Sequence, residues 1–349
     1  MPQHVDVCNG DADGLCAALQ WRLHEPAPAT LVTGLKREIA LLERVAANAG
    51  DEVNVFDLAM QRNRSALARL LDAGVRVRYF DHHAVQDIPS HPLLEALIDC
   101  ASDVCTSLLV DRHIGGAFRA WALVGAYGDN LTRVADCLAA DSGIGTGDRA
   151  RLRRLGEAIN YNAYGDDEPD VCIAPARLHA ILARYSDPRD LLAHEAIIDE
   201  IDALRGADLR QALDWPSHWQ DAGGSVHVLP DAPWSRRVLG CLANELANAQ
   251  PQRAHAVLKR QRTGGYAVSV RAPLAAPSGA HELCSRFGGG GRARAGGVDA
   301  LPAADLECFV SAFEGVRWGE PAGVVSSELG RGERELARTG PATGTQGRE

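Results

Sequence analysis

Short apolar runs alternate with helical patterns along the first half of the chain. The runs with the apolar, β-branched character of buried strands are His4–Cys8, Leu31–Thr33, Val53–Phe56 and Val75–Phe80. Segments with the apolar spacing of helices lie between and after these runs. The first ends near Leu23, and the others are Ile39–Ala47, Ser65–Leu71, Val104–Ile114 and Phe118–Tyr127. We interpret Ser65 as a helix cap. Strands that alternate with helices predict a parallel sheet covered by helices on both faces.

The second half predicts a connecting helix and another α/β unit. Residues from about 152 to 185 are helical but irregular, and contain the polar segment Asn160–Gly165, to which the pattern assigns no role. Asp187 and Pro188 cap a long amphipathic run, Arg189–Leu213. Strand-like and helical stretches then alternate again, at Val226–Leu229, Ser235–Ala249, Ala254–Leu258, Gly265–Arg271, Ala280–Arg286 and Ala303–Phe313.

The expected architecture is therefore α/β with two domains. A parallel-sheet domain spans residues 1–186, a helical linker spans 187–222, and a smaller α/β C-terminal domain spans 223–318. Residues 319–349 have few large apolar side chains, so we expect a disordered tail there.

Charge is unevenly divided between these parts. The chain of 349 residues has a formal net charge of −10. Residues 1–222 have 21 basic and 34 acidic side chains, a net of −13, whereas residues 223–318 have 11 and 7, a net of +4. An acidic domain suits bound cations, and a basic domain suits an anionic substrate. With no apolar run of about 18 residues and no secretion signal, we expect no membrane association and a cytoplasmic location.

Acidic residues follow the predicted strands of the first domain. Asp11, Asp57 and Asp81 each come directly after a strand-like run, at the carboxyl edge where ligands bind in open α/β folds. Asp11 belongs to the turn Asp11-Ala-Asp13-Gly14, whose two carboxylates can hold hard cations. A single turn aspartate is common, but three in register beside a histidine pair indicate a metal site.

A glycine cluster near the end of the second domain predicts an anion site. Four successive glycines, among them Gly289, Gly290 and Gly291, leave backbone N–H groups unshielded. Arg292 and Arg294 follow, and Arg271 lies on the preceding predicted strand. Glycine-rich turns are often mere connectors, but arginines add bidentate donors for a terminal phosphate.

These motifs together resemble the DHH phosphoesterase superfamily. The matching residues of the first domain are Asp11, Asp13, Gly14, Asp57, the tripeptide Asp81-His82-His83, and Asp129 within Gly-Ala-Tyr-Gly-Asp. In the second domain, Ser269-Val-Arg271 and Phe287-Gly-Gly-Gly-Gly-Arg292-Ala-Arg294 resemble the C-terminal substrate-binding domain of that family. The resemblance covers about residues 4–315, and the branch that opens with Asn-Gly-Asp-Ala-Asp-Gly shares the Asn160–Gly165 segment.

The resemblance implies a dinuclear metal centre. Asp57 would bridge two divalent cations, Asp11 would complete one site, and a second set would complete the other: Asp13, His82 and Asp129. His83 would contact the scissile phosphate, with Asp81, His82 and Asp57 counted among the catalytic residues. The cations are usually Mn²⁺, with Mg²⁺ or Co²⁺ as alternatives, and oxygen ligands with one imidazole suit such ions.

Three positions depart from the family's pattern. Asn9 precedes the first motif where many members have a histidine or a further aspartate. Asn130 follows Asp129 where several branches have threonine, and Arg292 stands where a histidine is usual. We expect the neutral amide of Asn9 to weaken the first metal site. We expect Arg292 to change which end group of the substrate is preferred.

The function implied is hydrolysis of phosphate esters by a metal-activated water, with a nucleotide or very short oligonucleotide as substrate. An acidic first domain argues against wrapping of long nucleic acid, which needs extended basic tracks. A RecJ-type single-strand exonuclease is the alternative, and a catalytically idle nucleotide-binding member is another. A homodimer is an open alternative to a monomer.

Overall fold

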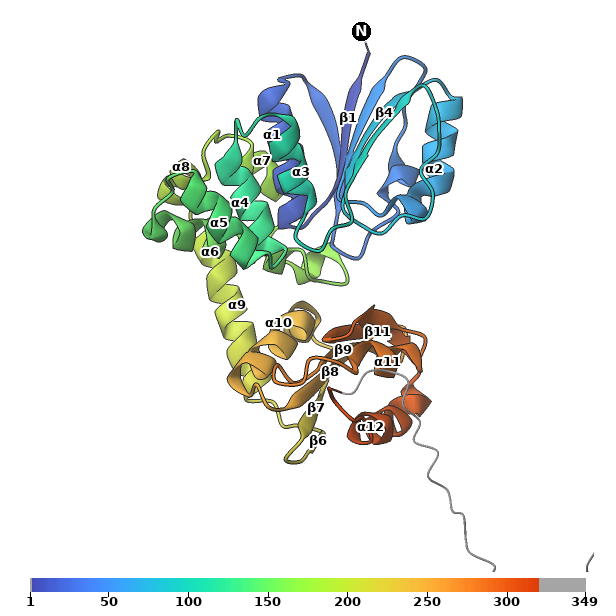
Figure 1. Ribbon diagram of the computed structural model, residues 1–349, viewed down its shortest axis with the longest axis vertical. Coiled ribbons are helices and arrows are strands. Elements are labelled where there is room, and N and C mark those ends of the chain that lie inside the picture. Colours follow the sequence, from blue (N-terminus) through green and yellow to red (C-terminus); the bar gives the residue numbers. More distant parts are fainter. Residues whose placement is uncertain (1, 320–349) are drawn as a thin grey trace, which may run out of the picture.

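The structure, a computed structural model, describes residues 2–319 and has two lobes, each built on its own β-sheet (Figure 1). Apart from Gly319, the predicted tail lies outside the described residues. Helix α9 runs from the upper lobe to the lower one, and strand β1 points from the N-terminus toward the lower lobe (Figure 1). The carboxyl edge of the first sheet therefore faces the second lobe.

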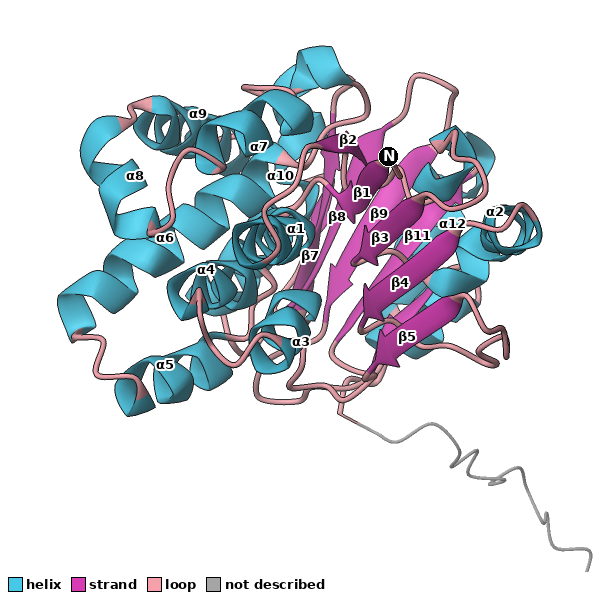
Figure 2. Cartoon of the chain, turned by 90° about the horizontal axis from the view of Figure 1, so that it is seen from above, coloured by secondary structure: helices cyan, strands magenta, loops and turns pink. Residues whose placement is uncertain are grey.

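All five strands of the first sheet are parallel, in the order β2-β1-β3-β4-β5. They are β1 His4–Asn9, β2 Ala29–Gly34, β3 Glu52–Phe56, β4 Arg76–Asp81 and β5 Leu94–Ile98. Helices α1 (Ala12–His24) and α3 (Thr106–His113) cover one face, and α2 (Met60–Asp72) covers the other (Figure 2). The predicted parallel sheet is confirmed, with one edge strand, β5, that the sequence did not reveal.

Two local predictions in this lobe are wrong. The segment Ile39–Ala47 is no α-helix and contains only a 3₁₀ turn, η1, at Leu41–Arg44. Its backbone is held by the Asn63 amide, which accepts from Leu42 N and donates to the Ile39 carbonyl, so bonds that a helix would make internally go elsewhere. Ser65 lies inside α2, which begins at Met60, and caps nothing.

A group of helices continues the first lobe and leads to the second. They are α4 Arg119–Gly128, α5 Thr132–Asp141, α6 Thr146–Asn162, α7 Pro175–Leu182, α8 Pro188–His194 and α9 Ile197–Leu213. The predicted continuous run Arg189–Leu213 is thus two helices separated at Glu195, whose backbone is extended. The predicted cap at Asp187 is present, and accepts a hydrogen bond from Arg189 N at 2.8 Å.

The second sheet is mixed and six-stranded, in the order β10-β11-β9-β8-β7-β6. Its strands are β6 Trp219–Gln220, β7 Gly224–Leu229, β8 Ala254–Arg260, β9 Tyr266–Arg271, β10 Gly290–Arg292 and β11 Ala295–Leu301. Within the described part of the chain, the only parallel pair of this sheet is β7 and β8, joined by α10 (Pro233–Ala249). A short helix, α11 (Ala280–Ser285), and a final one, α12 (Leu306–Glu314), complete this lobe.

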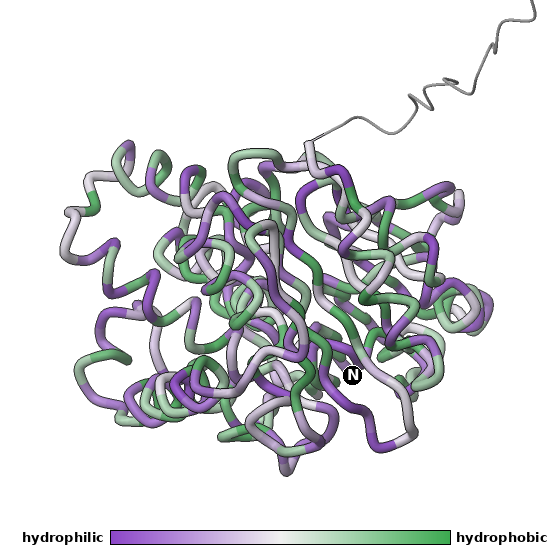
Figure 3. The backbone as a smooth tube through the Cα atoms, turned by 90° about the horizontal axis from the view of Figure 1, so that it is seen from below, coloured by the Kyte–Doolittle hydropathy of each residue, from purple (hydrophilic) through white to green (hydrophobic). Residues whose placement is uncertain are grey.

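Apolar side chains form separate cores under each sheet and a third around the helices between them. The tube in Figure 3 is greenest in the middle of the molecule, where the strands and the innermost helices run. The apolar side of α10, with Val238 and Leu242, belongs to the same core as helices of the first lobe. No helix among residues 2–319 is long and apolar enough to span a bilayer.

Candidate active site

The carboxyl ends of neighbouring parallel strands bring the predicted acids together. Asn9 ends β1, Asp81 ends β4, and Asp57 follows β3 directly. Asp57 has a left-handed backbone, with φ of 57°, a conformation in which aspartate and asparagine are enriched among non-glycine residues. Its N–H donates to the Phe80 carbonyl at 3.1 Å, which fixes the turn at the sheet edge.

Asp13 lies in the first turn of α1 and is held by the start of a different helix. Its two carboxylate oxygens accept hydrogen bonds from the backbone N–H groups of Thr106 and Ser107, at 2.7 and 2.8 Å. These are the first residues of α3, whose free N–H groups and dipole favour a negative charge. The sequence motifs did not point to Thr106 or Ser107.

The two histidines have different surroundings. His82 Nδ1–H donates to the Val104 carbonyl at 3.0 Å, and its Nε2 lies 3.3 Å from Asp57 Oδ1. His83 is 45% exposed, and its Nδ1 donates to Asp81 Oδ1 at 2.7 Å. This arrangement leaves one imidazole facing the carboxylates and the other facing the solvent side.

Asp57, His82 and His83 offer ligand atoms that lie within 4.8 Å of one another. The buried Asp81 Oδ2 beside them has no hydrogen-bond partner among residues 2–319, and a buried unpaired carboxylate oxygen is costly unless it meets a cation. Oxygens with one or two imidazoles fit a divalent ion such as Mn²⁺. The residues present therefore fit a metal ion.

The concentration of negative charge shifts several pKa values. Burial and the charges of Asp11 and Asp13 raise the pKa of Asp57 well above its ordinary value. Burial and Asp13 also raise the pKa of Asp129, to about 6. Burial lowers the pKa of His82, but the hydrogen bond with Asp57 and the nearby carboxylates outweigh it and raise the pKa to about 10. Without metal, these groups therefore hold their protons up to a higher pH than they would in water.

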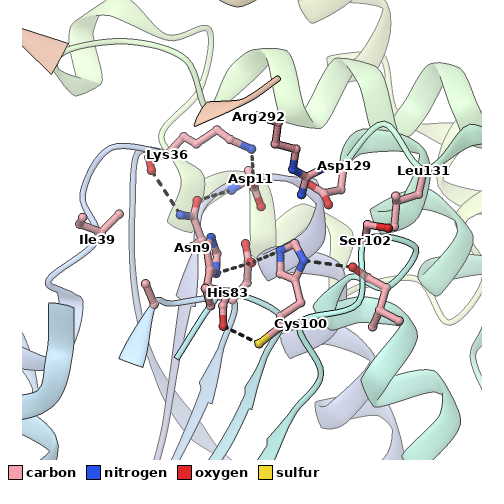
Figure 4. A pocket seen from close by; sticks show the side chains of 15 residues that line it. Asn9, Asp11, Lys36, Ile39, His83, Cys100, Ser102, Asp129, Leu131 and Arg292 are labelled. Carbon is pink, nitrogen blue, oxygen red and sulfur yellow. Dashed lines mark hydrogen bonds and ion pairs between the residues drawn. The ribbon is translucent and has the colours of Figure 1, made fainter. Parts of the chain in front are cut away.

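A lysine that the sequence analysis did not single out lies among these acids (Figure 4). The Lys36 ammonium pairs with Asp11 Oδ2 and donates to Asn160 Oδ1 at 3.1 Å. Burial raises the pKa of Asp11, but the lysine outweighs this and lowers it below its ordinary value. Lys36 follows no motif and is 25 residues from Asp11, so only the fold reveals the contact.

A cavity of about 470 Å³ opens in front of the acids. We call it the metal-side cavity, and its lining includes Asp11, Lys36, Asp57, His82, His83, Asp129 and Arg292. Arg292 comes from the second lobe and reaches toward Asp129 of the first (Figure 4). Cys100 and Ser102, which follow β5, also line it and were not predicted.

A second cavity of about 470 Å³, the arginine-side cavity, lies next to the first and shares Lys36 and Asp129 with it. Its other lining residues include Asn130, Asn160, Tyr164, Asn244, Asn248, Arg271 and Arg294. Arg271 and Arg294 thus lie together, while Arg292 lines the other cavity. The segment Asn160–Gly165 supplies Asn160 and Tyr164 to this wall.

The glycine cluster is part turn and part strand: Gly288 lies in a turn with φ of 74°, and β10 begins at Gly290. Gly290 and Gly291 pair with Gly297 and Gly296 in an antiparallel hairpin, β10 with β11. A Cβ on Gly289 would lie 2.1 Å from the Gly297 carbonyl oxygen, so glycine permits this close approach of two chains. Two of the glycines expected at the anion site, Gly290 and Gly291, thus belong to the edge strand of this sheet.

No protein-family model matches the sequence, and neither does any curated protein. Solved structures do match. The DHH domain of a member of a ribosomal-protein family is 14% identical, with a TM-score of 0.59 over 90% of this chain and 86% of that one. Exonuclease RecJ bound to manganese is 19% identical, with a TM-score of 0.51 and 89% of each chain covered. The pGpG-specific phosphodiesterase PggH from Vibrio cholerae is 15% identical, with a TM-score of 0.51 over 89% of this chain and 97% of that one.

These matches extend over about nine-tenths of the chain and so include both sheets. The first sheet is parallel with helices on both faces, and the second is a mixed α/β unit, as the motifs implied. The chain therefore has the fold of the DHH-domain proteins.

Proposed function

We propose that the protein is a metal-dependent phosphoester hydrolase that acts on nucleotides or very short oligonucleotides. The observation that carries this proposal is the grouping of Asp57, His82 and His83 at a sheet edge, opposite an arginine from the other lobe. A divalent ion held by Asp57, His82, Asp13 and Asp129 would supply a water of lowered pKa and positive charge beside the reacting phosphate. Mn²⁺ is the first choice, since RecJ is similar in fold and was solved with manganese.

The chain's own residues have separate tasks in this proposal. His83, with its Nδ1 engaged by Asp81, keeps Nε2 for the scissile phosphate, whose oxygen accepts a hydrogen bond when both ring nitrogens carry a proton. Arg292 lines the same cavity and adds a positive charge with a fork of N–H donors for a phosphate. Arg271 and Arg294 line the neighbouring cavity, where they bind the far phosphate or the end group of the substrate.

The size and charge of the cleft favour a small substrate. Each cavity is in the range that suits a small-molecule ligand. Tyr164 is the aromatic side chain in the lining of the arginine-side cavity, so this cavity offers one ring on which a base can stack. A long single strand needs a series of such rings and a basic track, and the first lobe is acidic.

The test is a turnover assay with Mn²⁺ and end-labelled substrates of graded length. Mononucleotides, RNA and DNA of about two to five residues, pGpG among them, and a single strand of about 20 residues would be compared, with Asp57→Asn as the inactive control. We expect kcat/KM for the short substrates to exceed that for the long strand by at least about tenfold.

Other outcomes identify the alternatives. Processive loss of the long strand with little turnover of dinucleotides would replace the proposal by a RecJ-type exonuclease. If the protein binds both Mn²⁺ and nucleotide but turns over none of the substrates, the proposal is replaced by a nucleotide-binding protein without catalytic activity.

A further inference from the structure

Lys36 places a positive charge at one side of the carboxylate group, and its position is tightly determined. The ammonium pairs with Asp11 Oδ2 and donates to Asn160 Oδ1 at 3.1 Å. The main chain of Lys36 is held as well: its N–H donates to the Ala163 carbonyl at 3.1 Å, and its carbonyl accepts from Asn9 Nδ2 at 3.3 Å. Hydrogen bonds therefore hold both the backbone and the ammonium of Lys36 beside Asp11.

On this side, a carboxylate oxygen that would hold a cation is already paired with the positive charge of Lys36. Asp11 Oδ1 accepts from Gly14 N–H at 3.1 Å, and Asp11 Oδ2 pairs with Lys36. Asn9 Oδ1 accepts from Asp11 N–H at 3.2 Å. The amide of Asn9 thus bridges the backbone N–H of Asp11 and the carbonyl of Lys36. Because the amide is neutral, it offers a cation no negative charge.

The opposite side of the group is different. His82 Nε2 is 3.3 Å from Asp57 Oδ1 and 3.9 Å from Asp13 Oδ2, and Asp129 completes the lining of the cavity in front of them. His82 Nε2 therefore lies within 4 Å of two carboxylates, and the ion pairs found there among the described residues are with histidine rather than with lysine or arginine.

The choice of lysine is unusual in this chain. Only two of its 36 basic Lys and Arg residues are lysines, Lys36 and Lys259. An ammonium is a compact point charge with three donors, whereas a guanidinium is a wide planar fork. The compact group suits the role of a single cation between a carboxylate and an amide oxygen.

We infer that the Lys36 ammonium takes the place of one of the two cations, so that the centre binds a single divalent ion with Asp13, Asp57, His82 and Asp129. This inference rests on the proposed metal-dependent function and changes its stoichiometry. One divalent ion and one ammonium supply three positive charges against the carboxylates of these three aspartates and Asp11. The protein then needs no second metal to make Asp11 stable in its buried position.

The first test counts ions in the full-length wild-type protein. Metal-free protein is titrated with Mn²⁺ by calorimetry, bound manganese is measured by elemental analysis after dialysis, and electron paramagnetic resonance spectra are recorded. We expect one Mn²⁺ per chain and the six-line spectrum of an isolated ion. Two ions per chain with an exchange-coupled spectrum would overturn the inference and leave the proposed hydrolase standing. No bound ion would overturn both.

The second test removes the ammonium. Lys36→Met keeps the length of the side chain but frees Asp11, so we expect binding to rise from one to two Mn²⁺ per chain, with a coupled spectrum. Lys259→Met is the matched control, because Lys259 is the other lysine and pairs with Asp166, which is not one of the proposed metal ligands. The Lys259→Met protein should still bind one ion. A folded Lys36→Met protein that binds one ion with unchanged affinity would overturn the inference. If this variant does not fold, the wild-type count decides.

Discussion

At the scale of single residues, Asp57 combines a special backbone conformation with a central charge. Its φ is 57°, and its carboxylate is buried beside His82 and within the field of Asp11 and Asp13. Such a position tolerates asparagine, which also adopts the left-handed region, better than alanine. The residue's charge and its conformation can therefore be tested separately.

For Asp57→Asn we expect loss of Mn²⁺-dependent activity by roughly 10²–10³-fold or more, as for removal of a principal charge-stabilising group. The melting temperature of the metal-free protein should stay the same or rise, because a buried carboxylate with a raised pKa is removed and φ is preserved. Steady-state turnover and calorimetric melting are the measurements. Activity near the wild-type level would remove Asp57 from the metal site.

Metal binding should release protons. His82 has a pKa of about 10 in the metal-free protein, and a metal ligand must be neutral. At roughly pH 8 we therefore expect at least about one proton per Mn²⁺ to be released, from His82 and from Asp57 where its raised pKa keeps it protonated. The release is measured as calorimetric heats that depend on the ionisation enthalpy of the buffer. The same heat in every buffer would contradict this. His82→Asn, which removes the histidine proton, is the control variant and should release fewer protons per Mn²⁺.

The same shift has a consequence for stability without metal. The folded pKa of His82 lies above that of the unfolded chain, so the stabilisation is fully present below about pH 6.5 and is lost as the pH rises through about 10. In EDTA, the melting temperature of the protein should therefore fall between about pH 6.5 and pH 10, through the contribution of His82. Saturating Mn²⁺ should reverse the trend, because binding to the folded state strengthens as the proton leaves.

At the scale of elements, the glycine-rich hairpin shows why a segment that looks like a loop forms a strand. Gly289 lies against the carbonyl of Gly297, where no Cβ fits, and Gly291 has a φ of 141°. The hairpin carries Arg292 and Arg294 at its turn and directs them to different cavities. Close packing of the two chains, rather than flexibility, accounts for the glycines.

Adjacent glycines allow a matched comparison. In Gly289→Ala the new methyl group would lie 2.1 Å from the Gly297 oxygen, so the free energy of unfolding should fall by about 1–3 kcal/mol. In Gly290→Ala no described atom lies within 4 Å of the new methyl group, and stability should change by less than about 0.5 kcal/mol. Urea unfolding of the two variants measures the difference. Equal losses would show that the pairing of β10 with β11 does not depend on this close approach.

At the scale of the whole molecule, buried ion pairs attach α10 to the first lobe. Arg236 Nη1 donates to Asp170 Oδ1 at 2.7 Å, and both side chains are nearly inaccessible. Arg237 Nε donates to Asp208 Oδ2 at 2.6 Å, and the same oxygen accepts from the Tyr161 hydroxyl. These contacts determine how the arginine-bearing lobe is presented to the metal-side cavity.

Breaking the buried pair should weaken the molecule far more than breaking an exposed one. Arg236→Met removes the short ion pair of the buried Asp170 and leaves it a longer contact with Arg262 and two backbone N–H donors. We expect a loss of about 3 kcal/mol, the low end of the range for breaking a buried pair. Arg154→Met removes exposed pairs with Asp199 and Asp202, and should change stability by less than about 1 kcal/mol. The comparison uses urea unfolding of both variants. A small effect of Arg236→Met would mean that water replaces the pair and that the lobes are held by apolar packing.

Much of this organisation follows from local patterns. The alternation of apolar strands with helices predicts the parallel sheet, and its register places Asp11, Asp57 and Asp81 at one edge, since parallel strands end on the same side. The glycine cluster and its arginines were likewise visible as a motif. The 3₁₀ turn at Leu41–Arg44 and the break before α9 were not, because contacts distant in sequence, such as those of Asn63 with the turn, decide where backbone bonds go.

Short-range periodicity and chain direction were enough to predict four of the five strands of the first sheet and its acidic edge with the histidine pair. Three features became visible only in the folded protein: Lys36 meets Asp11 and Asn160, α3 holds Asp13, and Arg292 lines a different cavity from Arg271 and Arg294. These contacts join residues far apart in the chain and have no local signature. Their formation depends on how the two lobes and the intervening helices pack, which is a property of the whole fold.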